Sequence, residues 1–212
     1  MFRYPDEKLI CSVFATRPRL VDCQHLADLN ILWYHLASTH LLHTCVGVTS
    51  LQGGTPMSKR LAGYDYSQPG FYFVTICTQH HRLIFGRVVD GQVSLKGPGL
   101  MAESVWVTLP RRFAHVKLHE YVFMPNHMHG IIELTGIDPT QTAARAALWE
   151  IVRVFKAATS YQIRHAEGQP WFAWQEEYYD SVIRTEAALQ RVRQYILENP
   201  VRWTQDTLYR PY

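Results

Sequence analysis

The chain has 212 residues, of which 47% are hydrophobic and 18% charged, a composition typical of a globular protein with one sizeable domain. No apolar run approaches the roughly 20 residues that span a bilayer, and the first residues lack the charged-then-apolar order of a secretory signal, so we expect a cytoplasmic protein without a membrane segment. The net charge of +3 permits an anionic partner without requiring one. The four cysteines form no C-x-x-C pair and indicate neither a zinc knuckle nor a disulfide framework.

The first quarter of the chain differs from the rest. Residues 1–56 hold three of the four cysteines and four histidines at no consistent ligand spacing. A turn-forming Gly-Gly-Thr-Pro sequence ends this segment, and Met57-Ser58-Lys59-Arg60 then has the character of a protein start. We therefore expect residues 1–56 to be an N-terminal extension, poorly packed or derived from a wrongly chosen start codon, and residues 57–212 to form the functional domain.

The first predicted elements of that domain are strands. Residues 71–78 are rich in β-branched and aromatic side chains and predict a strand. Residues 88–95 contain an Asp-Gly pair between apolar alternations, which predicts a hairpin. Residues 100–109 predict a helix that ends at Pro110.

Two histidines lie in the next pair of strands. Residues 115–124 predict a strand that turns at Pro125-Asn126 into a second strand over residues 127–134. Side chains alternate along a strand, so His127 and His129 should share one face. Such a pair can bind a divalent metal ion and leave coordination positions free, or it can be the polar edge of a sheet; the spacing alone leaves both open.

A long amphipathic helix follows. Apolar residues recur at three and four positions and predict a helix over residues 143–165. Its other face carries Arg153, Lys156 and Ser160 at helical spacing, which suits contact with phosphates or a solvated surface.

The last elements are short. Residues 181–184 predict a strand, and Thr185 is the expected N-cap of a final helix that ends near Asn199, because Pro200 follows. The order of elements predicts an α+β fold with helices packed on an antiparallel sheet. Within the final helix Tyr195 and Asn199 are four residues apart and share a face at the margin of the apolar stripe. They could line a cleft, or be a tyrosine at the edge of the core and a helix-ending asparagine.

Several short motifs occur in a fixed order along residues 63–203. They are Met124-Pro125-Asn126 directly before His127-Met128-His129, then Phe155-Lys156, Trp174-Gln175, Tyr178-Tyr179, Val182-Ile183-Arg184 and Tyr195-Ile196-Leu197-Glu198-Asn199-Pro200. In these motifs and their order the chain resembles the REP-associated tyrosine transposases, which are IS200-like Y1 transposases of the HUH nuclease superfamily. Residues 1–56 have no counterpart in the resemblance.

The resemblance implies a ferredoxin-like or RRM-like antiparallel sheet with helices packed on it, and it implies a role for each motif. His127 and His129 would bind a divalent metal ion, Mg²⁺ or Mn²⁺, and Tyr195 would be the nucleophile. Asn199 would be a third oxygen ligand, although related transposases often have Gln or Glu there. A neutral amide would bind the ion weakly until the substrate phosphate completes its coordination.

The implied activity is that of a single-stranded DNA endonuclease and strand transferase. Attack by Tyr195 would give a 5′-phosphotyrosine intermediate, in DNA transposition or in the processing of repetitive extragenic palindromes. One alternative is a single-stranded DNA-binding regulator with little catalysis on the same fold; another is a phosphodiesterase that uses an activated water. Relatives include monomers and dimers that exchange the tyrosine helix, so Tyr195 should lie over the histidine strand of its own chain or of a partner.

The substrate implied by the resemblance is single-stranded or hairpin DNA. Unpaired bases can stack on aromatic rings, and cationic side chains can contact the backbone. The candidates for stacking are Trp171, Trp174 and Tyr178, and those for the backbone are Arg153, Lys156 and Arg184.

Overall fold

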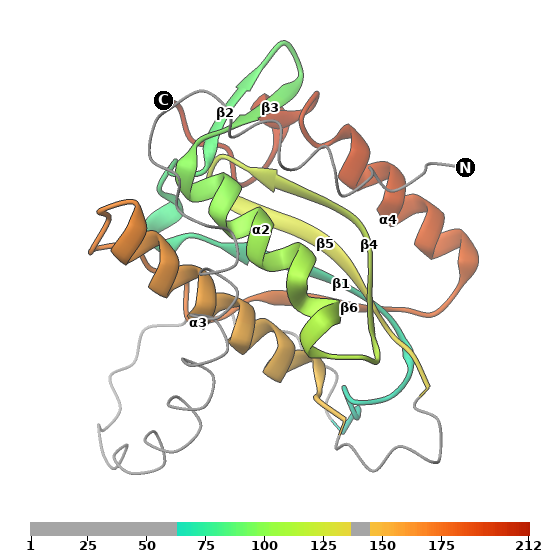
Figure 1. The fold of residues 1–212 in the computed structure, drawn as a ribbon. Coiled ribbons are helices and arrows are strands. Elements are labelled where there is room, and N and C mark those ends of the chain that lie inside the picture. Colours follow the sequence, from blue (N-terminus) through green and yellow to red (C-terminus); the bar gives the residue numbers. More distant parts are fainter. Residues whose placement is uncertain (1–62, 137–144) are drawn as a thin grey trace, which may run out of the picture. The chain divides into compact units, whose positions relative to one another are not determined.

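One four-stranded sheet, in the order β4-β5-β1-β6, organises the part of the chain that the structure describes. The computed structural model describes residues 63–136 and 145–212, so the predicted extension at residues 1–56 lies outside the described residues. The elements, in chain order, are β1 (Gly70–Cys77), η1 (Gln79–His81), β2 (Gly86–Val89), β3 (Gln92–Leu95), α2 (Gly97–Arg112), β4 (Val116–Met124), β5 (His127–Leu134), α3 (Leu148–Ala166), β6 (Tyr179–Ile183), α4 (Glu186–Glu198) and η2 (Trp203–Gln205) (Figure 1).

The connectivity of the sheet is that of a ferredoxin-like fold. Strands and helices follow one another as β1-α2-β4-β5-α3-β6, and every neighbouring pair in the sheet is antiparallel. The small β2-β3 hairpin is inserted before α2, and α4 follows the last strand. The predicted α+β class and ferredoxin-like sheet are therefore confirmed.

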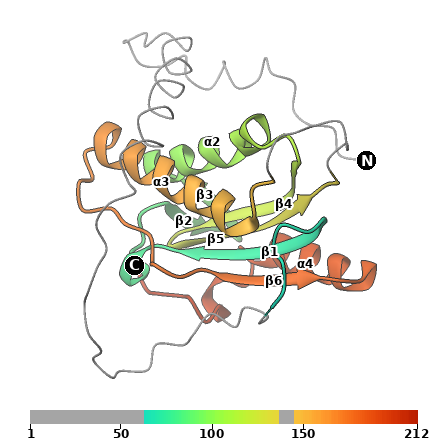
Figure 2. The ribbon, with the colours of Figure 1, turned by 90° about the horizontal axis from the view of Figure 1, so that it is seen from below.

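The two faces of the sheet are covered differently. Figure 2 shows α2 and α3 side by side on one face and α4 on the other. The α2 and α3 side buries the larger apolar core, which includes Tyr72, Trp106 and Phe155. The α4 side buries a smaller cluster of Ile131, Ile183, Leu189 and Ile196. The smaller cluster covers less of the sheet, and the buried His127 and His129 lie beside it on the same face.

Strand β5 shows the alternation that the sequence predicts. Met128 and Ile132 point into the larger core, whereas Ile131 points toward α4. His127 and His129 have the parity of Ile131 and so face α4. The pairing with β1 fixes this register, because Thr75 lies opposite His129.

Helix α2 is longer than predicted at both ends. It runs from Gly97 to Arg112, whereas the expected helix covered residues 100–109. Pro98 lies in the first turn, where a missing N–H costs nothing. Pro110 lies inside the last turn, and the helix continues past it until the Phe113 N–H bonds to the carbonyl of Leu109. The prediction that Pro110 ends the helix was wrong.

The other predicted elements are present with small shifts. The turn of the β2-β3 hairpin places Asp90 and Gly91 at φ of 50° and 71°, as a tight hairpin requires. Helix α3 starts at Leu148, five residues later than predicted, and its predicted apolar face is buried. The Thr185 side chain accepts a hydrogen bond from the Ala188 N–H, which confirms the predicted N-cap of α4. Within the described ranges, no helix is long and apolar enough to cross a membrane.

Candidate active site

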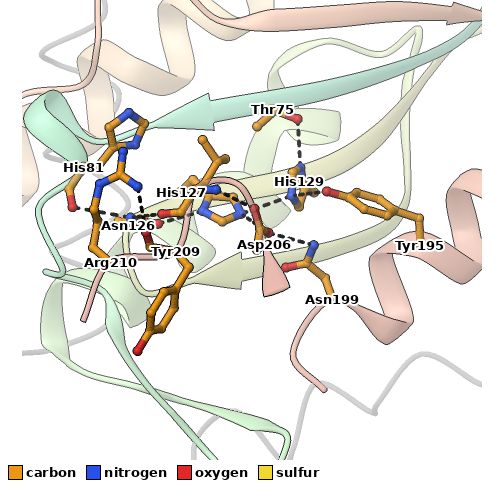
Figure 3. Close-up of polar contacts among 11 residues, drawn as sticks. Thr75, His81, Asn126, His127, His129, Tyr195, Asn199, Asp206, Tyr209 and Arg210 are labelled. Atoms are coloured by element: carbon orange, nitrogen blue, oxygen red, sulfur yellow. Dashed lines mark hydrogen bonds and ion pairs between the residues drawn. The ribbon is translucent and has the colours of Figure 1, made fainter. Parts of the chain in front are cut away.

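The two histidines of β5 converge at their ring nitrogens. His127 is fully buried and His129 is 2% exposed, and their Nε2 atoms are 3.0 Å apart (Figure 3). The two side chains point the same way because they are two residues apart on one strand. The sequence prediction of two imidazoles on one face is confirmed.

The Nδ1 atoms of both rings form hydrogen bonds with neighbouring polar groups. The Nδ1 atom of His127 is 2.7 Å from the Asn126 Oδ1 atom. The Asn126 Nδ2 group donates to the carbonyl of Leu208 at 2.9 Å, so its Oδ1 atom must be the acceptor toward His127. His127 therefore carries its proton on Nδ1 and presents a lone pair on Nε2. The Nδ1 atom of His129 is 2.8 Å from the Thr75 hydroxyl.

Helix α4 brings a tyrosine to the histidine pair. The Tyr195 hydroxyl is 3.2 Å from the His129 Nε2 atom. Phe73 supports both residues, since its ring stacks on His129 and contacts the edge of Tyr195. Tyr195 is 45% exposed, so one side of its ring faces solvent. Tyr195 thus lies next to the histidine strand of its own chain.

A carboxylate that the sequence analysis missed completes the cluster. The Asp206 Oδ2 atom is 3.8 Å from the His127 Nε2 atom, and the carboxylate side chain is 6% exposed. Asp206 follows η2, whose Trp203 packs its ring 5.9 Å from that of His127. No periodic spacing links Asp206 to the histidines, so the sequence carried no signal for it beyond its place between the aromatic residues Trp203 and Tyr209.

Asn199 lies beside this carboxylate. Its Nδ2 group donates to Asp206 Oδ2 at 3.2 Å. Its Oδ1 atom is buried and has no hydrogen-bond partner among the described residues. A buried amide oxygen without a donor is costly, which is consistent with a place for a cation nearby. Ligation by Asn199 stays a prediction, and Asp206 is a second oxygen candidate.

The arrangement fits a divalent metal ion. The ligand atoms of His127, His129 and Asp206 all lie within 4.8 Å of one another. Two nitrogen ligands about 2.1 Å from one ion and at right angles to each other would be about 3.0 Å apart, and the two Nε2 atoms are 3.0 Å apart. A proton on the His129 Nε2 atom can form a hydrogen bond to the His127 Nε2 atom. A cation that faces both nitrogen lone pairs can take the place of that proton. The mixed nitrogen and oxygen donors do not identify the ion.

Burial determines the charge of the site near neutral pH. Burial lowers the pKa of His127 well below its ordinary value, and nearby His129 and His81 lower it further. Burial also lowers the pKa of His129 to about 4, although the Asp206 carboxylate partly opposes this. Both imidazoles are neutral at pH 7, as metal ligation requires.

Tyr195 must lose its proton before its phenol oxygen can act as a strong nucleophile. Burial and the Asp206 carboxylate raise the pKa of Tyr195, and a hydrogen bond with Asn199 partly offsets them. The phenol is therefore protonated at neutral pH when no cation is near. A cavity of about 280 Å³ opens next to it, lined by Tyr195, Glu198, Asn199, Arg202, Gln205, Asp206 and Thr207. A substrate group in that cavity would lie against the phenol.

Two of the residues predicted to stack on DNA bases are core residues. Trp174 is 7% exposed, packs among the rings of Phe85, Phe155 and Phe172, and donates its indole N–H to Thr159. Tyr178 is 9% exposed. Neither ring has an open face for a base, so these two predictions were wrong. Trp171, by contrast, is 47% exposed.

The predicted cationic contacts lie away from the histidines. Arg153 and Lys156 belong to α3, on the face of the sheet opposite α4 (Figure 2). The Lys156 ammonium donates to the carbonyl of Glu176. Arg184 follows the end of β6, where Ile183 pairs with Phe71, and Phe71 is about 13 Å along β1 from Thr75. None of the three joins the cluster around Tyr195, and their contact with DNA stays a prediction.

Comparison with known proteins places the chain in a family. No family model matches the chain. A protein of Haemophilus influenzae, described as uncharacterized, is 35% identical over 167 residues, which cover 72% of this chain and 92% of the relative. The chain belongs to the family of this Haemophilus protein. The match covers nearly the whole of that family member, so the two share a domain rather than a short motif.

The chain is also similar to two solved structures. One is a REP-associated tyrosine transposase bound to a REP hairpin, with 21% identity and a TM-score of 0.44, covering 67% of this chain and 74% of the other. The second is a candidate transposase from Deinococcus radiodurans, with 17% identity and a TM-score of 0.37, covering 65% of this chain and 95% of the other.

Proposed function

We propose that the protein is a metal-dependent single-stranded DNA endonuclease and strand transferase whose nucleophile is Tyr195. The observation that carries the proposal is the placement of the Tyr195 hydroxyl 3.2 Å from His129, within a cluster of two neutral imidazoles and a carboxylate. A phenol next to a candidate metal site is suited to attack on a phosphodiester, because the phosphate oxygens repel an anionic nucleophile unless their charge is offset.

Different residues of the site would bind the metal ion and orient its ligands. His127, His129 and Asp206 would hold the divalent ion, Mg²⁺ or Mn²⁺, with the Asn199 amide oxygen as a further ligand candidate. Asn126 and Thr75 would fix the orientation of the two rings through their Nδ1 atoms. When bound, the ion would offset charge on the phosphate oxygens and favour ionisation of the phenol.

The reaction replaces one phosphate ester with another. The Tyr195 oxygen would form a bond to phosphorus while the bond from phosphorus to the 3′ oxygen breaks. The phenol loses its proton and the departing 3′ oxygen gains one, so the products are a 5′-phosphotyrosine and a 3′-hydroxyl. The covalent link keeps the ester bond energy, so the reverse attack by another 3′-hydroxyl would rejoin DNA without ATP.

The access to Tyr195 would limit which DNA can react. The phenol must reach the phosphorus with its oxygen in line with the leaving 3′ oxygen, which an unpaired strand can allow more easily than a duplex. The cavity next to the phenol is lined by Arg202, Gln205 and Thr207, which can bind a phosphate or hydrogen-bond a sugar or base. By the sequence resemblance the DNA would be a hairpin of repetitive extragenic palindromes with a single-stranded flank.

A denaturing gel tests the proposal. The full chain is incubated with 3′-end-labelled hairpin DNA that carries a single-stranded flank, with Mn²⁺ or Mg²⁺ and with EDTA. We expect a protein–DNA adduct that survives denaturation, requires the metal ion, and is absent in Tyr195→Phe and His127→Ala. Tyr179→Phe, which alters an exposed tyrosine outside the cluster, is the matched control and should form the adduct normally.

Other outcomes would select a different function. Cleavage that persists in Tyr195→Phe would indicate an activated water as nucleophile. DNA binding without any cleavage or adduct would indicate a regulator that retains only the fold and the affinity. If a mixture of the Tyr195→Phe and His127→Ala variants forms the adduct that neither variant forms alone, α4 is exchanged between chains.

A further inference from the structure

A row of exposed aromatic and cationic residues lies along the outer face of α3, on the side of the sheet opposite the candidate active site. Trp149, Arg153, Ala157 and Tyr161 follow one another at four-residue spacing and are all exposed. Helix geometry places Trp149 and His165 about 24 Å apart along the axis. The row therefore covers nearly the full length of the helix.

Each of the two aromatic rings on the helix contacts a side chain four residues further along. The Arg153 guanidinium lies 5.8 Å from the centre of the Trp149 ring. The His165 ring lies 4.4 Å from that of Tyr161. These contacts hold the side chains along the surface while the helix itself buries its other face in the core. The Trp149 side chain is 50% exposed, so a planar group can lie against its ring.

The row continues past the end of α3. The Arg164 Nε group donates to the carbonyl of Phe172 at 2.7 Å, which ties the segment containing Trp171 to the last turns of the helix. The Arg82 guanidinium lies 4.6 Å above the Trp171 ring. We name Trp149, Arg153, Tyr161, Arg164, His165, Trp171 and Arg82 together the α3 row.

Exposure distinguishes the two tryptophans of the row from the others. Trp149 is 50% exposed and Trp171 is 47% exposed. The remaining tryptophans within the described ranges, Trp106, Trp174 and Trp203, are at most 7% exposed. Large rings left in water give up the free energy of burial, so two of them beside arginines suggest a binding surface rather than unused core residues.

The charge of the helix favours an anionic partner. Helix α3 contains three residues with cationic side chains, Arg153, Lys156 and Arg164, and one with an acidic side chain, Glu150. Arginine beside an aromatic ring suits a nucleotide, because the ring can stack on the base while the guanidinium contacts the phosphate. Tryptophan and arginine are also common at protein interfaces, so a protein partner is the alternative that the measurements must exclude.

We propose that the α3 row binds a single-stranded DNA segment that flanks the cleaved site. The identity of the strand rests on the proposed function, whereas the binding itself does not require Tyr195. Because α3 and Tyr195 lie on opposite faces of the sheet, a strand held along α3 is not cut there. The row would retain the DNA while the reacting phosphate enters and leaves the active site.

Binding measured without cleavage tests this proposal. The Tyr195→Phe full chain in EDTA is titrated into a fluorescein-labelled, unstructured single-stranded oligonucleotide, and fluorescence anisotropy gives the Kd. We expect Trp149→Ala and Trp171→Ala each to raise the Kd by about 5- to 150-fold. Arg153→Glu should raise the Kd and reduce its salt dependence, because one phosphate contact is lost.

Controls separate this surface from general charge. Lys117→Glu makes the same charge change on β4, on an exposed side chain outside the row, and should alter the Kd much less than Arg153→Glu. The same oligonucleotide in a duplex should bind more weakly than the single strand, because its bases cannot stack on the rings.

Three results would overturn the proposal, and a fourth would reject only the proposed chemistry. Unchanged affinity in both tryptophan variants would exclude stacking on the row. An equal Kd for the duplex and the single strand would indicate nonspecific electrostatic binding without base stacking. A change of oligomeric state in Trp149→Ala, measured by light scattering, with unchanged DNA affinity would identify the row as a protein interface. Failure of the adduct experiment with intact anisotropy would reject the proposed chemistry and leave the row as a DNA-binding surface.

Discussion

The two faces of β5 have the same backbone but opposite environments. On one face Met128 and Ile132 pack into the apolar core beneath α2 and α3. On the other, His127 and His129 lie with Asp206 and the buried oxygen of Asn199 beneath α4. The first face gains free energy from burial, whereas the second buries polar groups at a cost. The comparison indicates that the strand contributes stability through one face and reactivity through the other.

Making both faces apolar should remove activity without unfolding the protein. We expect the double variant His127→Leu and His129→Leu to lose metal binding and adduct formation completely, because both nitrogen ligands are absent. Its free energy of unfolding should change little, because the gain from two aliphatic side chains of similar volume is offset by the loss of the hydrogen bonds to Asn126 and Thr75. Urea unfolding in EDTA together with the adduct assay measures both. A strongly destabilised variant would show that the imidazoles also hold the fold.

Weakening the apolar face should have the converse effect. Trp106 is fully buried, and its ring lies so close to Gly130 of β5 that a Cβ added at this glycine would be 2.6 Å from the ring. We expect Trp106→Ala to lower the free energy of unfolding by about 3 to 5 kcal/mol because it leaves a cavity. The fraction that stays folded should still form the adduct. Loss of adduct in a folded sample would mean that the two faces are coupled.

The polar face should also make stability depend on pH. The folded protein holds the pKa of His129 at about 4, below the ordinary 6.5 of the unfolded chain. Between these values the unfolded chain binds a proton that the folded chain does not, so the free energy of unfolding should fall by about 3 kcal/mol as pH decreases through this range. His127 acts in the same direction. Urea unfolding in EDTA across this range measures the loss, and His129→Leu should reduce it.

The smallest expected effect concerns the support of the polar face. Asn126→Ala removes the acceptor for the His127 Nδ1–H and the donor to the Leu208 carbonyl, and should weaken Mn²⁺ binding by about 10- to 100-fold. Asn126→Asp keeps the acceptor and should lose less. Calorimetric titration with Mn²⁺ compares them. Wild-type affinity in Asn126→Ala would show that His127 needs no such support.

The sequence predicted most of the fold because its signals are local and periodic. Alternation placed both histidines on one face of β5, and helical spacing placed Tyr195 at the edge of the buried face of α4. Pro110 was misinterpreted because a proline in the last turn of a helix removes a hydrogen bond without preventing one more turn.

The errors in the site have a tertiary origin. Trp171 and Trp174 are three residues apart in one aromatic segment, yet one is exposed and the other lies in the core. The difference arises because Trp174 forms a bridge with Thr78 at the end of β1, which turns its ring inward. Asp206 reaches His127 only because the segment after α4 folds back beneath the sheet, which no spacing in the sequence reveals.

The register between β1 and β5 couples correct folding to metal binding. Thr75 lies opposite His129 in the native pairing. A slip of one residue would turn both imidazoles into the apolar core and bring Met128 to the surface beneath α4. A chain with mispaired strands would then have no nitrogen ligands to offer, so a metal ion would select correctly paired molecules from a mixture of folded and misfolded forms.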